Sequence, residues 1–341
     1  MKYSDRQLND AVLNGIFTKE QVDNFKNHIM STDTKASGLL NVLYYGGGLL
    51  VISALTWLMK SSWDSFGAKG IVFFSFVYLI SFFIAGHYVY FKKKLIVPGG
   101  ILFSIVIAIT PLLVFGIMKA FDFWPASAGY EDYYIWIKGK WVVLEISTLV
   151  IGIIILLLTR FPFNMFLIAF TLWFFSMDIV PIILQTNSFT WTDRAIVSRV
   201  FGTLMLIAAY VIDIKYEKNY SFWLYLFGLI TLSSGLSVFY NTDTLMLFAF
   251  GLVNILLIGI SVVLERNVFL VFGTIGVMEF LSRLSYKYFK GSPMFPFTLT
   301  IIGVGLIIIG ISYQKNKSTV DKRIKMIIPD FFFRLKPKRL R

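Results

Sequence analysis

The segment WVVLEISTLVIGIIILLLT (141–159), then Arg160, then FPFNMFLIAFTLWFFSMDIVPIILQ (161–185), decides the fold class of this chain. Its only charged side chains are Glu145, Arg160 and Asp178. A helix needs about 20 mainly apolar residues to cross the hydrocarbon core of a bilayer, and each half of the segment has about that length. The segment therefore predicts two consecutive membrane-spanning helices that are joined at Arg160.

Apolar runs of this kind recur along the whole chain of 341 residues, which is 57% hydrophobic and 15% charged. A soluble domain carries about 25% charged residues. The runs that predict spans are 38–59, 70–90, 96–118, 141–159, 161–185, 198–214, 221–239, 245–264, 268–286 and 295–313. The sequence thus predicts an all-α, polytopic transmembrane helix bundle of about ten spans. We expect a cytosolic helical hairpin at 1–37, the bundle at 38–313 and a basic, aromatic cytosolic tail at 314–341.

The distribution of Lys and Arg predicts how the bundle is oriented. With the N-terminus inside, 22 of the 32 basic residues fall on inner segments, and cytoplasmic loops carry the excess of positive charge. The first 37 residues have no basic stretch followed by a short apolar one, so we expect no cleavable signal peptide. The prediction is a multi-pass protein of a bacterial-type inner (cytoplasmic) membrane, with both termini cytoplasmic and the 119–140 loop outside.

The N-terminal segment has the pattern of two short helices. Ser4 to Gln7 and Thr18 to Gln21 both fit the capping box, in which a hydroxyl residue is followed three positions later by Glu or Gln. Asn14-Gly15 lies between them and is typical of a helix end. The expected hairpin either caps the first span or binds a cytosolic protein partner. Nucleic acid is not an expected partner, because basic and acidic residues balance here.

Four stretches of the sequence carry a family resemblance. They are LNGIFTKEQVDNF (13–25), LYYGGGLLVISALTWLM (43–59), FGLVNILLIGISVVLERNVFLVFGTIGVMEFLSRL (250–284) and IIGVGLIIIGISYQKNK (301–317). In these the chain resembles an uncharacterised family of bacterial predicted polytopic membrane proteins with an N-terminal cytosolic hairpin. The resemblance implies the topology and brings no catalytic residue with it.

Charged side chains inside the spans are the candidate binding site. A charge in the hydrocarbon region is costly, and those that remain usually face a cavity or one another. The candidates lie in the outer half of four predicted spans: Glu145, Asp178, Arg199, Glu279 and Arg283. Together they predict an outward-facing cavity for a polar or cationic ligand. The alternatives are a structural ion pair between Glu279 and Arg283, which are four residues apart, and interfacial carboxylates hydrated near the headgroups.

Helix-breaking and small residues accompany these charges. Pro111 and Pro181 can break spans locally, as in transporter sites, or form packed kinks. The glycines at 46–48, at 273 and 276, and at 303 and 305 permit close helix contacts. The aromatic outer loop 119–140 fits either a lid over a ligand or an interfacial segment.

The sequence lacks the residues of most enzymatic chemistries. It has no Cys, and its only histidines are His28 and His87, so we expect no metal site and no cofactor. It contains no HExxH, GxGD, GxSxG or Walker A motif. An enzymatic function is therefore not expected.

The C-terminal tail concentrates positive charge, with ten of the 32 Lys and Arg in the last 28 residues. Each basic residue near an anionic leaflet contributes about 1 kcal/mol of attraction. Tail docking onto anionic lipids is predicted, and the alternatives are binding of an acidic partner or nucleic acid, or a disordered tail that only sets the topology. The residues expected at the membrane surface are Lys322, Arg323, Lys325, Arg334, Lys336, Lys338, Arg339 and Arg341.

Two functions are consistent with this sequence. The first is a transporter or permease for a small polar or lipid-derived molecule. The second is a non-transporting membrane sensor or scaffold that acts through its hairpin and tail.

Overall fold

The computed structural model describes residues 67–124, 140–180, 190–216, 219–237 and 244–289, with residue 183 and parts of 11–57 and 294–308. Across these residues the secondary structure is helical, and no strand is present among them. The all-α fold class is confirmed.

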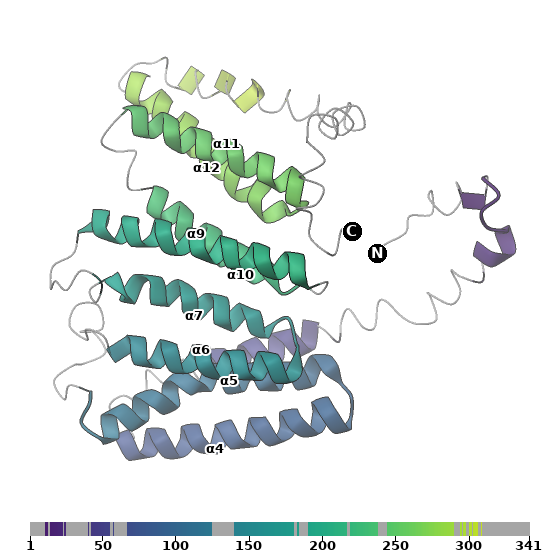
Figure 1. The fold of residues 1–341 in the computed structure, drawn as a ribbon, viewed down its shortest axis with the longest axis vertical. Coiled ribbons are helices and arrows are strands. Elements are labelled where there is room, and N and C mark those ends of the chain that lie inside the picture. The colour runs from purple at the N-terminus through teal and green to yellow at the C-terminus, as the bar shows by residue number, and fades with distance from the viewer. Residues whose placement is uncertain are drawn as a thin grey trace.

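The described helices lie across the bundle largely in the order in which they occur in the chain (Figure 1). The elements are α4 (Gly67–His87), the π-helical turn η1 (Tyr88–Lys92), α5 (Ile96–Ala120), α6 (Lys140–Thr159), α7 (Asn164–Asp178), α9 (Trp191–Lys215), α10 (Ser221–Leu236), α11 (Thr244–Leu264) and α12 (Asn267–Phe289).

Six of the described helices are long and apolar enough to cross a membrane, and the chain is a multi-pass integral membrane protein. They are α4 with η1, α5, α6, α9, α11 and α12. Three shorter apolar helices are Val42–Ala54, α7 and α10. The predicted span 295–313 lies mostly outside the described residues, so the count of about ten remains a prediction.

The outward faces of the helices are apolar, as a lipid environment requires. On α6, Val143, Ile146, Val150, Ile154 and Leu157 are exposed, and they recur at helical spacing on one face. The opposite face of α6 is buried and carries the polar residues Glu145, Thr148 and Thr159. An apolar exterior around a more polar interior is the distribution expected in a bilayer.

The bundle is a row of antiparallel helix pairs (Figure 1). The pairs α4–α5, α9–α10 and α11–α12 have the most extensive contacts, and α7 connects α6 to α10. Of the six long helices, α5 is the most enclosed. It packs against α4, α6 and α7, which places the interior of the first half of the bundle beside α5.

The structure contains two helix breaks that the sequence marks with very few polar residues. Arg160 has φ of 49° between α6 and α7, and Glu265 has φ of 50° between α11 and α12. A left-handed residue at this position ends an α-helix. The predicted division of 141–185 and of 245–286 into two helices each is therefore confirmed.

Small residues bring helices α9 and α10 together. A Cβ atom added to Gly202 would lie 2.6 Å from the backbone nitrogen of Leu232 and 2.9 Å from the carbonyl oxygen of Gly228. Gly273 and Gly276 of α12 lie in the same way against Asn254 of α11. The close contact predicted at Gly273 and Gly276 is thus confirmed.

Two predicted segments are described only in part. Near the N-terminus, Gly15 has φ of 70°, and Thr18 and Gln21 exchange hydrogen bonds of 2.9 and 3.2 Å between side chain and backbone. The rest of the predicted hairpin lies outside the described residues. In the 119–140 loop, the described Trp124 is buried against Phe115 and Trp141.

Candidate functional site

A cavity of about 270 Å³ lies among α5, α6 and α7. Its lining is Ile52, Ile107, Ala108, Pro111, Leu112, Trp141, Leu144, Glu145, Thr148, Leu167, Phe170, Thr171, Phe174 and Asp178. Most of these side chains are apolar or aromatic, and two are carboxylic acids. An apolar hollow with a few convergent polar groups is the usual form of a ligand site.

The two carboxyl groups of the cavity come from neighbouring antiparallel helices. Glu145 lies in the second turn of α6, and Asp178 is the last residue of α7. Because the chain reverses between these helices, both residues lie at the same end of the bundle. Their carboxyl groups lie close enough to interact with each other. Glu145 is 7% exposed, and its Oε2 has no hydrogen-bond partner among the described residues.

A cation of α9 acts on this acidic pair. The guanidinium of Arg194 interacts electrostatically with the carboxyl group of Asp178, and it also lies 5.6 Å from the ring centroid of Trp191. A capping box at Thr190 begins α9, with Thr190 and Asp193 bonding each other's backbone N–H groups at 3.2 and 2.8 Å. The cap fixes where the helix starts and so places Arg194 in its first turn.

The aromatic wall of the cavity is held by edge-to-face contacts. Trp141 packs on Trp124 with ring centroids 5.5 Å apart, and Trp124 packs on Phe115 at 4.9 Å. Pro111 of α5 also lines the cavity. Because proline has no N–H, it cannot donate to the carbonyl of Ile107 one turn earlier, and Ile107 lines the same cavity. The lining thus combines aromatic faces with carboxyl groups.

Of the five predicted site residues, Glu145 and Asp178 line this cavity and the other three do not. Glu279 and Arg283 form an ion pair of 3.0 Å along α12, with side chains 36% and 39% exposed. The ion pair that the sequence offers as the alternative for these two residues is therefore present in the structure. Arg199 lies on α9, where its Nε donates to the carbonyl oxygen of Ala195 at 3.2 Å.

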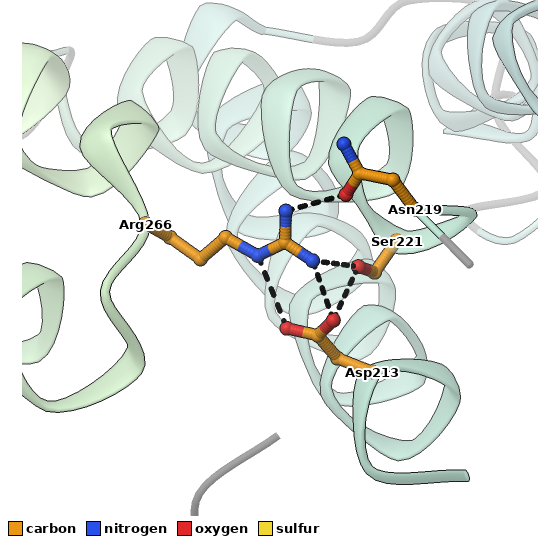
Figure 2. A network of polar contacts seen from close by, with 4 residues as sticks. All are labelled: Asp213, Asn219, Ser221 and Arg266. Atoms are coloured by element: carbon orange, nitrogen blue, oxygen red, sulfur yellow. Dashed lines mark hydrogen bonds and ion pairs between the residues drawn. The ribbon is translucent and has the colours of Figure 1, made fainter. Parts of the chain in front are cut away.

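A second polar cluster, drawn in Figure 2, lies where α9 ends, whereas Arg194 and the cavity lie where α9 begins. Arg266, in the α11–α12 connection, donates to both carboxylate oxygens of Asp213 at 2.5 and 3.2 Å. It also donates to Ser221 at 2.8 Å and to Asn219 at 2.5 Å. The ring centroid of the buried Tyr225 is 5.8 Å from its guanidinium carbon. These hydrogen bonds join the α11–α12 connection to the end of α9 and the start of α10.

The sequence did not identify this cluster. In the sequence, Arg266 is one charge in a short connection between two predicted spans. Asp213 lies in the last turn of α9, near Lys215. A lone Arg in a three-residue connection and an Asp within an apolar run were the two signals available. Their contact spans 53 positions in sequence, so it became visible only once the helix pairs were placed.

The same end of the bundle has further inter-helix hydrogen bonds. Tyr90 donates to the carbonyl oxygen of Thr159, and Tyr220 donates to that of Arg160 at 2.8 Å. Ser104 of α5 donates to Asn164 of α7 at 2.7 Å. These contacts satisfy backbone and side-chain groups at the helix ends, where the helices leave carbonyls without partners. This end is thus cross-linked by polar contacts, whereas the other end contains the cavity.

Two further predictions concern a metal site and the C-terminal tail. No group of three or more His, Cys, Asp or Glu side chains able to hold a metal ion occurs in the described part of the chain. The eight basic residues of the predicted membrane-surface tail, Lys322 to Arg341, lie outside it.

Comparison with protein families, with curated proteins and with solved structures gives no match for this chain.

Proposed function

We propose that this membrane protein is a permease-like transporter, and that the cavity among α5, α6 and α7 is its ligand site. One observation carries the proposal. Two acidic side chains, Glu145 and Asp178, come together in a cavity of a lipid-embedded bundle whose remaining lining is mainly apolar. A purely structural role would pair such carboxyls with donors, as Asp213 is paired. Ionisable residues kept within a membrane usually mark a substrate or ion pathway.

The architecture supports this proposal in a second way. The end of the bundle that contains Asp213 and Arg266 is cross-linked by buried polar contacts. The cavity end has a proline in α5 and an α7 helix that ends at Asp178 itself. Transporter sites are often built from helices that are interrupted within the membrane. We therefore propose that the cavity end opens and closes while the other end stays fixed.

The proposed location is a bacterial-type inner membrane, with the cavity end of the bundle facing outward. The excess of Lys and Arg on the segments assigned to the inside supports this orientation. In this orientation the Asp213–Arg266 network lies near the cytoplasmic surface.

Accessibility of the cavity from the two sides of the membrane tests the proposal. The chain has no cysteine, so Thr148→Cys places a single thiol in the lining. Sealed right-side-out and inside-out vesicles are treated with a membrane-impermeant thiol reagent. A transporter alternates its access, so we expect the thiol at position 148 to be modified from both sides.

A matched control is Ile154→Cys on the same helix, whose side chain is 47% exposed on the lipid-facing side. It should resist the water-soluble reagent from either side. Modification of position 148 from one side only, or from neither, would count against transport and favour a sensor or scaffold.

A further inference from the structure

The two hydroxyl groups among the described lining residues of the cavity are already engaged as hydrogen-bond donors. The hydroxyl of Thr148 donates to the carbonyl oxygen of Leu144 at 2.7 Å, and that of Thr171 donates to Leu167 at 2.8 Å. Both protons are therefore used within their own helices. Among the described residues, the lining contains no Lys, Arg or His. The carboxylate oxygens of Glu145 and Asp178 are hydrogen-bond acceptors, which suit a cation.

The aromatic faces of the cavity favour the same class of ligand. Trp141, Phe170 and Phe174 line it from α6 and α7. A cation over an aromatic face is attracted by the ring, and quaternary ammonium groups are typically bound this way. A small hydrated metal ion would not use this apolar surface, whereas a cation with organic substituents would bury it.

The charges around the carboxyl pair leave room for one more positive charge. Two carboxyl groups that lie together away from water cannot both be ionised at low cost, which favours a state of the pair with one proton and one negative charge. Arg194 of α9 acts on that charge. On α6, the other charged residue is Lys140 at the start of the helix. On α5, the charged residue is Lys119, whose ammonium lies over the Phe115 ring. The α5 residues that line the cavity are apolar. Loss of the remaining proton would create a second negative charge.

We propose, resting on the transport function above, that the ligand is an organic cation with apolar substituents and that its binding releases one proton from the Glu145–Asp178 pair. The step is an exchange of charge. The carboxyl O–H bond breaks, its proton passes to water, and its electron pair remains on the carboxylate, which then faces the bound cation. The total charge of the site is the same before and after. A proton gradient would then drive movement of the cation in the opposite direction.

The probe for this proposal is benzyltrimethylammonium, with 2,2-dimethylpropylbenzene as its neutral isostere. Binding to the full chain in detergent is measured by calorimetry in two buffers of different ionisation enthalpy, which gives the number of protons released. We expect close to one proton per cation bound. Because the proton competes with the ligand, the Kd should fall about tenfold for each unit of rising pH while the pair holds its proton. The isostere should release none.

Variants identify the group that loses the proton. Glu145→Gln and Asp178→Asn should each abolish proton release and remove the pH dependence of Kd. Glu279→Gln is the matched control, since Glu279 is an acid of the bundle that does not line the cavity, and it should behave as the wild type. If Glu145→Gln does not fold, the comparison of cation and isostere on the wild-type chain still decides the matter.

Three results would overturn the exchange: no saturable cation binding at millimolar concentration, binding without proton release, or equal release by the neutral isostere. Each of these would leave the thiol-labelling result at position 148 unaffected. Labelling from both sides without cation-linked release would therefore retain transport and discard the ligand class. Labelling from one side only would discard transport itself.

Discussion

The guanidinium of Arg266 bonds both carboxylate oxygens of Asp213, and the two side chains are 7% and 0% exposed. The contact joins the α11–α12 connection to the last turn of α9 (Figure 2). Ser221 accepts from Arg266 and donates to Asp213, each at 2.8 Å. A buried ion pair contributes little when its partners are both replaced, but removing one partner leaves an uncompensated charge.

We therefore expect Arg266→Gln alone to lower the free energy of unfolding by about 3–5 kcal/mol. Asp213→Asn alone should have a similar effect. The double variant should lose clearly less than the sum of the two, because the second change removes the charge that the first left unpaired. Reversible unfolding in mixed micelles gives the three values.

The exposed Glu279–Arg283 pair is the control for this cycle. Its charges are more than one-third exposed, and surface pairs contribute about 0–1 kcal/mol. Two results together would contradict this prediction: strictly additive effects of the Asp213 and Arg266 variants on the free energy of unfolding, and losses as small as those of the Glu279 and Arg283 variants. They would show that the network does not hold the helix pairs together.

The contact between α9 and α10 depends on the absence of a side chain at Gly202. Alanine there would place a methyl group against backbone atoms of Leu232 and Gly228, which cannot move as a flexible side chain can. Overpacking of this kind costs about 1–3 kcal/mol, so we expect Gly202→Ala to unfold more readily. Gly259→Ala is the control, because nothing described lies within 4 Å of its added Cβ. It should be neutral or stabilising by up to about 1 kcal/mol.

Tyr220 gives a pH-dependent contribution at the same end of the bundle. Its hydroxyl donates to the carbonyl oxygen of Arg160. Burial raises the pKa of Tyr220, the nearby Tyr90 and Tyr216 raise it further, and Arg160 lowers it. The neutral phenol is thus favoured in the folded chain, so its contribution is complete below the unfolded pKa, about 10. That contribution is lost as pH rises through the folded value.

We expect Tyr220→Phe to cost about 0.5–1.5 kcal/mol near neutral pH, the usual contribution of one hydrogen bond. The difference from wild type should shrink as the pH rises above about 10, where the wild-type phenol ionises. Unfolding measured at a series of pH values checks this. A gap that widened in alkali would contradict the assignment.

The connection between η1 and α5 and the end of α5 should lie on opposite sides of the membrane. Lys93→Cys and Phe123→Cys place single thiols before and after this 25-residue helix. With a membrane-impermeant maleimide added to intact cells, we expect modification at 123 and protection at 93. Modification of both in intact cells would remove α5 from the set of spans, and the reverse pattern would invert the bundle.

The sequence predicted those features of the fold that depend on local composition. Apolar length predicts the six long apolar helices. Arg160 and the polar residues at 265–267 are enough to locate two helix breaks, because an apolar helix has few other interruptions. The i,i+4 spacing of Glu279 and Arg283 predicts a pair, and the pair is present. Features of this kind need no knowledge of how one helix packs on another.

The candidate site was predicted only in part, because depth in the membrane does not tell which helices are neighbours. Glu145 and Asp178 come together because α6 and α7 form consecutive antiparallel helices. Glu279 has a similar predicted depth but lies on α12, which packs on α11 and α10. Asp213 and Arg266 meet through the packing of two helix pairs, which no local pattern encodes.

The last prediction separates a binding site from a structural one. Glu145 is held in an apolar cavity where one carboxyl oxygen has no described partner, so its carboxylate contributes little to folding. We expect Glu145→Gln to leave the free energy of unfolding within about 1 kcal/mol of wild type, or to raise it, since an amide has nearly the same shape as the carboxyl group and never ionises. Asp178→Asn should cost more, because Arg194 loses an attractive charge. Both are measured beside Arg266→Gln in the same micelles. If Glu145→Gln lost as much stability as Arg266→Gln, the acidic pair would be a structural contact, and the cavity would have no claim to a ligand.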